Sequence, residues 1–127
     1  MKIFLSIIGL IFSLQAYSQN TSFVKLILND SSDQAQSSFQ SSSGDYFLLY
    51  NTNSSGQGSK DFGISKTDGL GDVIWAYTYG KSNQDSATSM SPTSDGGVIV
   101  CGYTEGSSNN KDGFVSKISS SGALQWS

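Results

Sequence analysis

The chain has no histidine and no arginine, and it has one cysteine and one proline among its 127 residues. Without histidine, a Ser-His-Asp triad, a Cys-His pair and a zinc site with a histidine ligand are excluded. A single cysteine allows neither an intramolecular disulfide nor a four-cysteine metal site. We therefore expect no cofactor and no metal.

Cationic side chains are also scarce. All seven basic residues are lysines, and the net charge is −3. Because phosphate contacts need clustered cationic donors, we do not expect the chain to bind nucleic acid. Serine makes up about a fifth of the chain and there are 14 glycines, a composition that suits turns and exposed strand faces better than helix interiors.

Carboxylate pairs are the remaining option for catalysis, as in glycoside hydrolysis. Asp33 and Asp85 occupy equivalent places in the repeat described below, and so do Asp61 and Asp112. Such equivalence favours a structural role, a turn cap or an edge hydrogen bond, so we predict that the chain is not an enzyme.

Two other features have a second interpretation. The segment Asp68-Gly69-Leu70-Gly71-Asp72 could be a calcium loop, but it lacks the spaced further carboxylates that calcium needs. Cys101 lies in an apolar run, one repeat after Leu49, and we expect a small buried hydrophobic residue there. A reactive thiol is the alternative, although no histidine is present to activate it.

The first residues are typical of a secretory signal peptide. Lys2 precedes an apolar run over residues 3–14, which is too short to span a bilayer comfortably. Ala16 and Ser18 are small residues suited to a cut between Ser18 and Gln19. A cut after Ala16 and an uncleaved anchor helix are the alternatives. We therefore predict a signal peptide over 1–18, secretion or display at the cell surface, and no stable membrane span.

The remaining chain repeats itself with a period near 50. The segment that begins at Asp61 and ends in Ser65-Lys66 returns 51 residues later as the one that begins at Asp112 and ends in Ser116-Lys117. Both segments run on to a tryptophan, Trp75 or Trp126, and Phe23 occupies the same place 52 residues before Trp75. Such a period is typical of repeat proteins built from β-sheet blades.

Strand and turn signals divide each repeat in the same way. In the second unit we predict strands over residues 86–93, 98–104, 112–119 and 123–126. The turn Ser94-Asp95-Gly96-Gly97 joins the first two, since glycine supplies positive φ. The continuous apolar start at residue 98 predicts burial on both faces of that strand. The fold class is therefore all-β, with two four-stranded antiparallel meanders in a domain over 19–127. Unit one covers about 23–74, unit two about 75–125, and a third begins at 126.

These motifs resemble the secreted bacterial β-propeller repeat family. The resemblance rests on an aromatic strand ending in Tyr79-Gly80, on Asp85-Ser86-Ala87, on Asp95-Gly96-Gly97 before an apolar triplet, and on Gly102-Tyr103-Thr104. It implies a partial, unclosed β-propeller in a large extracellular or surface protein, and the leader resembles those of Bacteroidetes. Two blades cannot close a ring of four to eight, so further blades or a homo-oligomer would be needed, and a fragment is favoured.

Two functions follow from this resemblance. The first is a non-enzymatic module for binding, adhesion or scaffolding, whose partner is an extracellular protein or glycan. Its contacts would come from the polar loops over residues 53–60 and 105–111, because rigid blades present variable loops. The alternative is a fragment of a larger extracellular enzyme that acts on polysaccharide and carries its catalytic residues elsewhere.

Overall fold

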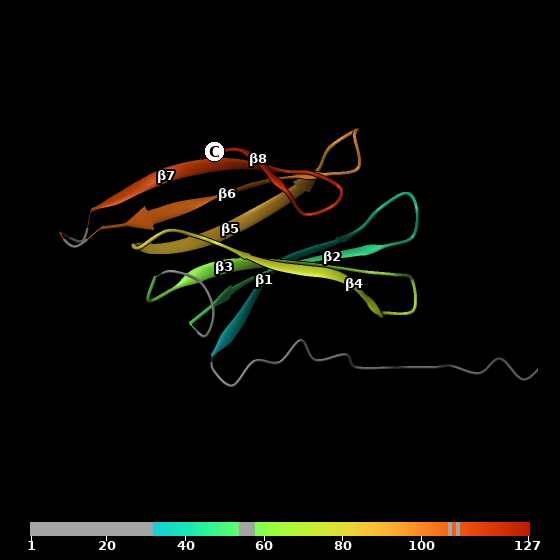
Figure 1. Cartoon of the computed structure of the whole chain (residues 1–127), viewed down its shortest axis with the longest axis horizontal. Helices are drawn as coiled ribbons and strands as arrows, with labels where there is room; N and C mark the ends of the chain where they lie inside the picture. Colours follow the sequence, from blue (N-terminus) through green and yellow to red (C-terminus); the bar gives the residue numbers. More distant parts are fainter. Residues whose placement is uncertain (1–31, 54–57, 107, 109) are drawn as a thin grey trace, which may run out of the picture.

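The computed structural model describes residues 32–53, 58–106, 108 and 110–127. In these residues the chain forms eight strands in two sheets (Figure 1). The first sheet contains β1 (Asp33–Gln40), β2 (Tyr46–Thr52), β3 (Asp61–Thr67) and β4 (Val73–Tyr79). The second contains β5 (Gln84–Pro92), β6 (Val98–Glu105), β7 (Lys111–Ile118) and β8 (Leu124–Trp126).

Both sheets are antiparallel meanders in which the strands follow their order in the sequence. The prediction of an all-β chain with two four-stranded sheets is confirmed. Across the part that the structure describes, no helix is long and apolar enough to cross a membrane. The predicted signal peptide, its cleavage site at Ser18 and Gln19, and the repeat position Phe23 lie outside the described residues.

The repeat in the sequence is a repeat of backbone geometry. The register of β1 on β2 shifts between Ala35 and Ser37, and that of β5 on β6 shifts 52 residues later, between Ala87 and Ser89. The turns repeat as well, because the four glycines with positive φ form two equivalent pairs: Gly44 with Gly96, and Gly71 with Gly122. Each of these glycines adopts a backbone conformation that other residues rarely adopt.

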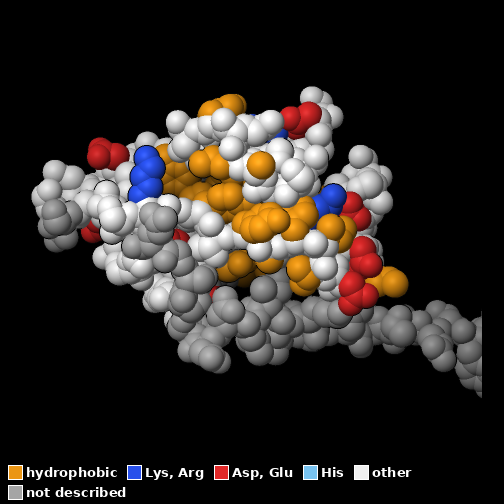
Figure 2. Space-filling view, in the orientation of Figure 1, with side chains coloured by type: hydrophobic (Ala, Val, Ile, Leu, Met, Phe, Trp, Pro, Cys, Tyr) orange, Lys and Arg blue, Asp and Glu red, His pale blue; other side chains and the backbone are white. Residues whose placement is uncertain are grey.

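The core lies between the two sheets, which pack face to face. Its large aliphatic side chains that are fully buried come from both sheets, and they are Leu49, Ile64, Val98, Val100 and Ile118. Hydrophobic side chains gather in the gap between the sheets (Figure 2). Burying each such side chain contributes about 1.5–3 kcal/mol, so this shared layer stabilises both sheets at once.

Strand β6 does not follow the predicted burial on both faces. Val98 and Val100 point into the core and are fully buried, whereas Ile99 and Cys101 are half-buried. Successive side chains of a strand point to opposite faces, and no described sheet covers the second face here. The expectation that Cys101 is buried is wrong for the same reason, although its equivalent Leu49 is fully buried between the sheets.

Each sheet holds one aromatic ring over one glycine of the neighbouring strand. In the first sheet Tyr50 of β2 lies opposite Gly63 of β3. In the second sheet the order is reversed, and Phe114 of β7 lies opposite Gly102 of β6. A Cβ at Gly102 would lie 2.1 Å from the carbonyl oxygen of Ser86 and 2.9 Å from the Phe114 ring. Each sheet thus pairs one aromatic residue with one glycine, but the aromatic residue lies on the second strand of the first sheet and on the third strand of the second sheet.

We expect the substitution Gly102→Ala to destabilise the second sheet by about 1–3 kcal/mol or more, because rigid backbone must move to admit the methyl group. The measurement is the free energy of unfolding in urea. Gly113→Ala is the matched control, because it lies on the adjacent strand and a Cβ there would meet no atom closer than 3.9 Å. An equal effect of the two substitutions would contradict the packing described.

Candidate functional site

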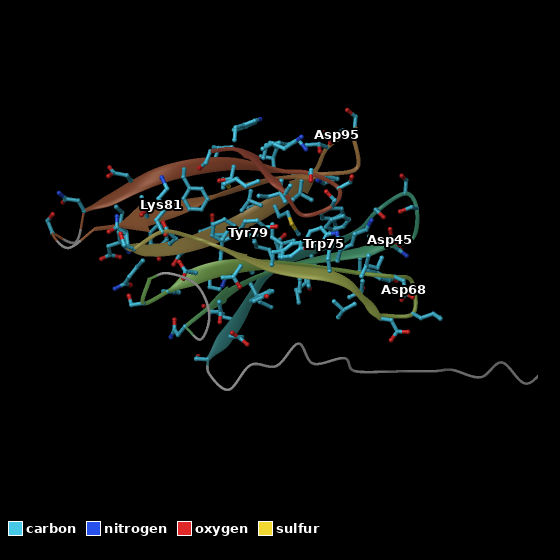
Figure 3. The ribbon with its side chains drawn as sticks, viewed as in Figure 1. Asp45, Asp68, Trp75, Tyr79, Lys81 and Asp95 are labelled. Atoms are coloured by element: carbon cyan, nitrogen blue, oxygen red, sulfur yellow. The ribbon has the colours of Figure 1, made fainter. Side chains whose placement is uncertain are left out.

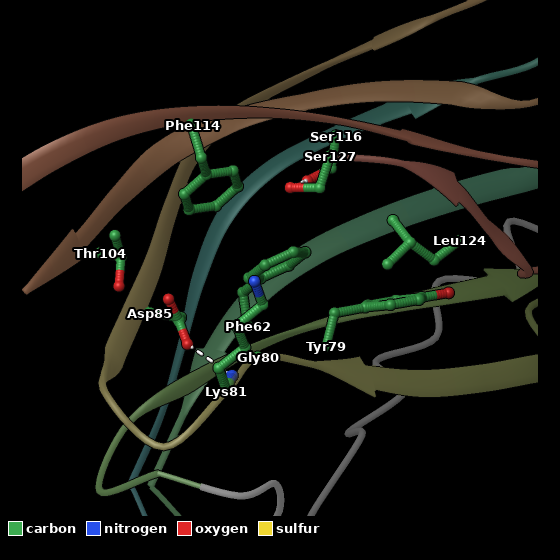
Figure 4. A pocket seen from close by; sticks show the side chains of 10 residues that line it. All are labelled: Phe62, Tyr79, Gly80, Lys81, Asp85, Thr104, Phe114, Ser116, Leu124 and Ser127. Carbon is green, nitrogen blue, oxygen red and sulfur yellow. Dashed lines mark hydrogen bonds between the residues drawn. The ribbon is translucent and has the colours of Figure 1, made fainter.

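A small cleft opens between the sheets where β4 passes into β5 (Figure 4). It encloses about 140 Å³. Its lining comes from both sheets and consists of Phe62, Tyr79, Gly80, Lys81, Asp85, Thr104, Phe114, Ser116, Leu124 and Ser127. Ligand pockets usually measure about 300–1,000 Å³, so this cleft has room for a small group and not for a sugar chain.

One wall of the cleft is aromatic. The ring of Phe62 stacks on Tyr79 at 5.5 Å and on Phe114 of the other sheet at 5.4 Å. The carboxyl group of Asp85 also lines the cleft; it is buried and accepts a hydrogen bond of 2.7 Å from the backbone N–H of Lys81. Asp85 therefore holds the turn between β4 and β5, which limits its freedom to act on a ligand.

The phenol of Tyr79 is also committed to the structure. Its hydroxyl donates a 2.6 Å hydrogen bond to the carbonyl oxygen of Gly122, in the turn before β8. Burial raises the pKa of Tyr79 well above its usual value, and the nearby Tyr77 and Tyr50 raise it further. The phenol stays neutral at physiological pH, so it joins the sheets and does not supply a base.

The four aspartates that were considered for catalysis lie in two rows, one in each sheet. Asp33, Thr52 and Asp61 are direct neighbours across β1, β2 and β3. The equivalent row in the second sheet consists of Asp85, Thr104 and Asp112. Their surroundings differ, because Asp61 is fully buried and accepts the backbone N–H of Gly58 at 3.2 Å, whereas Asp112 is exposed. Equivalent acids in the two sheets therefore do not share one chemical environment.

The turn after β1 and the turn after β5 each form an ion pair with a lysine, and the sequence did not suggest these pairs. Lys66 lies 3.0 Å from Asp45, and its equivalent Lys117 lies 3.0 Å from Asp95. Figure 3 labels both aspartates in their turns. They occupy different places, since Asp45 follows Gly44 whereas Asp95 precedes Gly96, but both pair with the same lysine position. A Cβ at Gly97 would lie 2.4 Å from Nζ of Lys117, so this glycine makes room for the ion pair.

The turn proposed as an alternative calcium loop uses its first carboxylate as a cap. Oδ1 of Asp68 accepts the backbone N–H groups of Leu70 and Asp72, both at 2.9 Å. In the equivalent turn Oγ of Ser119 accepts the N–H of Ala123 at 3.0 Å. Within residues 32–53, 58–106, 108 and 110–127, no three potential acidic, cysteine or histidine ligands come together to hold a metal ion.

The tryptophan of the first sheet anchors the second. The indole N–H of Trp75 donates to the carbonyl oxygen of Ser120 at 3.1 Å. Its ring meets Phe47 edge-on at 6.0 Å and stacks on Tyr77 at 5.6 Å. A Cβ at Gly122 would lie 2.5 Å from the Tyr77 ring, so this glycine lets the turn sit on the aromatic pair. The equivalent tryptophan of the second sheet, Trp126, is half exposed.

The other repeat positions singled out from the sequence are spread over the fold. Gly96 has the positive φ of the turn between β5 and β6, with Gly97 beside it, and Asp61 and Asp112 lie near the starts of β3 and β7. The predicted contact loops are described only in part. In the second loop Lys111 pairs with Glu105 at 3.6 Å and lies 4.5 Å from the centre of the Tyr103 ring.

Asn51 is the residue that sequence reasoning missed. Its side-chain amide donates to the carbonyl oxygen of Ala87 at 3.1 Å and accepts the N–H of Ala87 at 2.9 Å. Ala87 borders the irregularity in β5, and both residues are buried. The amide therefore satisfies two buried backbone groups across the interface. A polar residue following Leu48-Leu49-Tyr50 was the available signal.

We expect Asn51→Ala to destabilise the protein by about 2–4 kcal/mol, because each buried backbone group left unsatisfied costs about 1–3 kcal/mol. Urea unfolding measures the change. Tyr103→Ala is the control, since Tyr103 is the equivalent residue of the second sheet and no described sheet covers it. Equal losses from both substitutions would show that the bond between the sheets contributes little.

The acidic turns predict a dependence of stability on pH. Hydrogen bonds from Thr93, Lys117 and the N–H of Gly97 lower the pKa of Asp95, and Lys66 and Ser43 lower that of Asp45. A carboxyl with a lowered folded pKa stabilises the fold above its unfolded pKa of about 3.9 and loses this effect as the pH falls through the folded value.

Asp95→Asn should therefore lower Tm at neutral pH and flatten the decline of Tm below about pH 4. The effect is small because Asp95 is half exposed. Thermal melts across this pH range test the expectation, with Asp112→Asn, at an exposed position of β7, as the control. Parallel pH profiles of the wild type and Asp95→Asn would contradict it.

No family model matches the chain, and no curated protein matches it.

Proposed function

We propose that this chain is a non-enzymatic extracellular module of the β-propeller type, which serves in binding, adhesion or scaffolding. The observation that carries the proposal is the repeated geometry of the two sheets. They share strand order, β-bulge position and turn glycines. The two faces that pack together are not equivalent in the repeat, because the first sheet uses one side and the second sheet uses the other. Sheets that stack in this way can be extended by further units, as in repeat proteins.

The polar groups of the cleft support a module without catalysis. Asp85 caps a turn, and the hydroxyl of Tyr79 donates a hydrogen bond to a carbonyl oxygen. The volume of the cleft, about 140 Å³, is small. Catalysis by two carboxylates needs an acid and a base or nucleophile placed around a bound sugar. The described cleft offers one carboxylate to such a substrate, so binding at exposed loops is the better-supported role.

Export from the cell is the second part of the proposal, and it rests on the sequence. Lys2, the apolar run over residues 3–14 and the small residues Ala16 and Ser18 form the pattern of a cleaved leader. Secretion places the loops over residues 53–60 and 105–111 in contact with extracellular proteins and glycans.

A glycan screen tests the proposed function. The purified protein is passed through gels that contain xylan, pectin or mucin glycans, and each polysaccharide is then assayed for new reducing ends. We expect retardation by at least one polymer and no new reducing ends. Release of reducing ends would show an enzyme and overturn the proposal.

The exported state is tested by mass. We expect the product in the medium or on the cell surface to begin at Gln19, as judged by intact-mass spectrometry. A product that stays in the cytosol with residues 1–18 attached would refute an extracellular role.

A further inference from the structure

The outward face of the second sheet repeats the face that the first sheet buries. Val115 occupies the place of Ile64, yet Val115 is 48% exposed and Ile64 is 0% exposed. Cys101 is half-buried in the place of the fully buried Leu49. Trp126 is 52% exposed in the place of Trp75, which packs on the second sheet. The outward face of the second sheet therefore has the same pattern, with Ile99 and Tyr103 beside it, half-buried, and no strand among the described residues covers it.

The complementary face belongs to the same chain. The second sheet covers the first with the side that carries Val98 and Val100, both fully buried. The equivalent side of the first sheet carries Tyr46, in the place of Val98, and Tyr46 is 41% exposed. At the same end of these strands, Val73 and Leu70 are 56% and 75% exposed. Both halves of the internal interface thus have a second, partly exposed counterpart. The outer side of the first sheet is the less apolar of the two, because Thr67 is in the place of Ile118 and Ser38 is in the place of Met90.

We propose that copies of this chain associate head to tail, with the outward face of the second sheet of one copy docking on the outer side of the first sheet of the next. The inference rests on the proposed function, since it names a second copy as the partner of that stacked module. Such an interface is heterologous, because different surfaces of the two copies meet. It continues the contact already formed between the two sheets of one chain.

The proposed interface has a specific polar contact. Within the chain, the indole N–H of Trp75 binds the carbonyl oxygen of Ser120, in the turn that contains Gly122. The equivalent partners are Trp126 in one copy and the turn with Gly71 in the next, where Gly71 has the same positive φ as Gly122. We expect the indole of Trp126 to donate to the carbonyl oxygen of Gly69, which occupies the position of Ser120.

One contact of the internal interface is not reproduced. Asn51 binds both backbone groups of Ala87 within the chain, and Tyr103 occupies the place of Asn51 on the outward face. A phenol cannot both donate to a carbonyl group and accept an N–H in the geometry of an amide. We therefore expect association between copies to be weaker than packing within a copy and to depend on concentration.

Two substitutions block one face each. Val115→Asp places a charge on the outward face of the second sheet, and Tyr46→Asp places one on the outer side of the first. Both positions are partly exposed in the single chain, so the fold should tolerate them. Leu124→Asp is the matched control, because Leu124 is 53% exposed but faces the cleft within the chain. Circular dichroism and thermal melts confirm that each variant folds.

Light scattering after size-exclusion chromatography then measures the mass of each sample. We expect the wild type and Leu124→Asp to form assemblies that grow with concentration, whereas Val115→Asp and Tyr46→Asp alone stay monomeric. An equimolar mixture of those two variants should form dimers and nothing larger, since one intact pair of faces remains between them. The fluorescence of the wild type should also shift to the blue on assembly, and Trp126→Phe should remove most of that shift.

Three results would overturn the proposal. They are a monomeric wild type at high concentration, assembly of the single variants equal to that of the wild type, and a mixture of the two variants that stays monomeric. The glycan gels are run on the same samples, so the two proposals can fail separately. Retardation without self-association removes only the head-to-tail interface, whereas new reducing ends remove the proposed function and leave the interface standing.

Discussion

Burial of an apolar layer between the two sheets is the interaction on which the rest of this structure depends. A single four-stranded meander has little core of its own, because its apolar face would otherwise lie in water. Here Leu49 and Ile64 of one sheet meet Val98, Val100 and Ile118 of the other. The layer excludes water, so each polar group inside it needs a partner. That requirement explains the Asn51 amide bound to Ala87 and the Tyr79 hydroxyl bound to Gly122.

Much of the fold could be predicted from the sequence because its signals are local. Glycines that recur at fixed spacing, such as Gly44 and Gly96, mark turns that few other residues can form, and the spacing of the tryptophans gives the repeat length. The different burial of Leu49 and Cys101 could not be predicted in this way. Equivalent residues share a backbone position, but their burial depends on which sheet is covered, and this is a property of the whole assembly.

The candidate site was harder to predict because its parts come from different sheets. Phe62, Tyr79 and Phe114 belong to one aromatic cluster, although about two-fifths of the chain separates the first from the last. The ion pairs Lys66–Asp45 and Lys117–Asp95 could not be predicted from the repeat, because the aspartate changes position between the two units while the lysine does not. Sequence comparison between repeats detects identical residues at identical places, whereas the structure preserves the interaction and lets its residues move.

An interface formed by two different faces leaves one face of each kind free when only two sheets stack. Each sheet buries one face on its neighbour, and within the part of the chain that the structure describes no further strand covers the opposite face of either sheet. In this chain the uncovered face of the second sheet has not become polar, since it keeps Val115, Ile99 and Trp126 where a terminal cap would carry charges. Contiguous exposed apolar surface often marks an interaction site, and here it also matches a surface that is buried elsewhere on the same chain. This match between buried and exposed positions is the physical reason to seek the function of the module in assembly as well as in its loops.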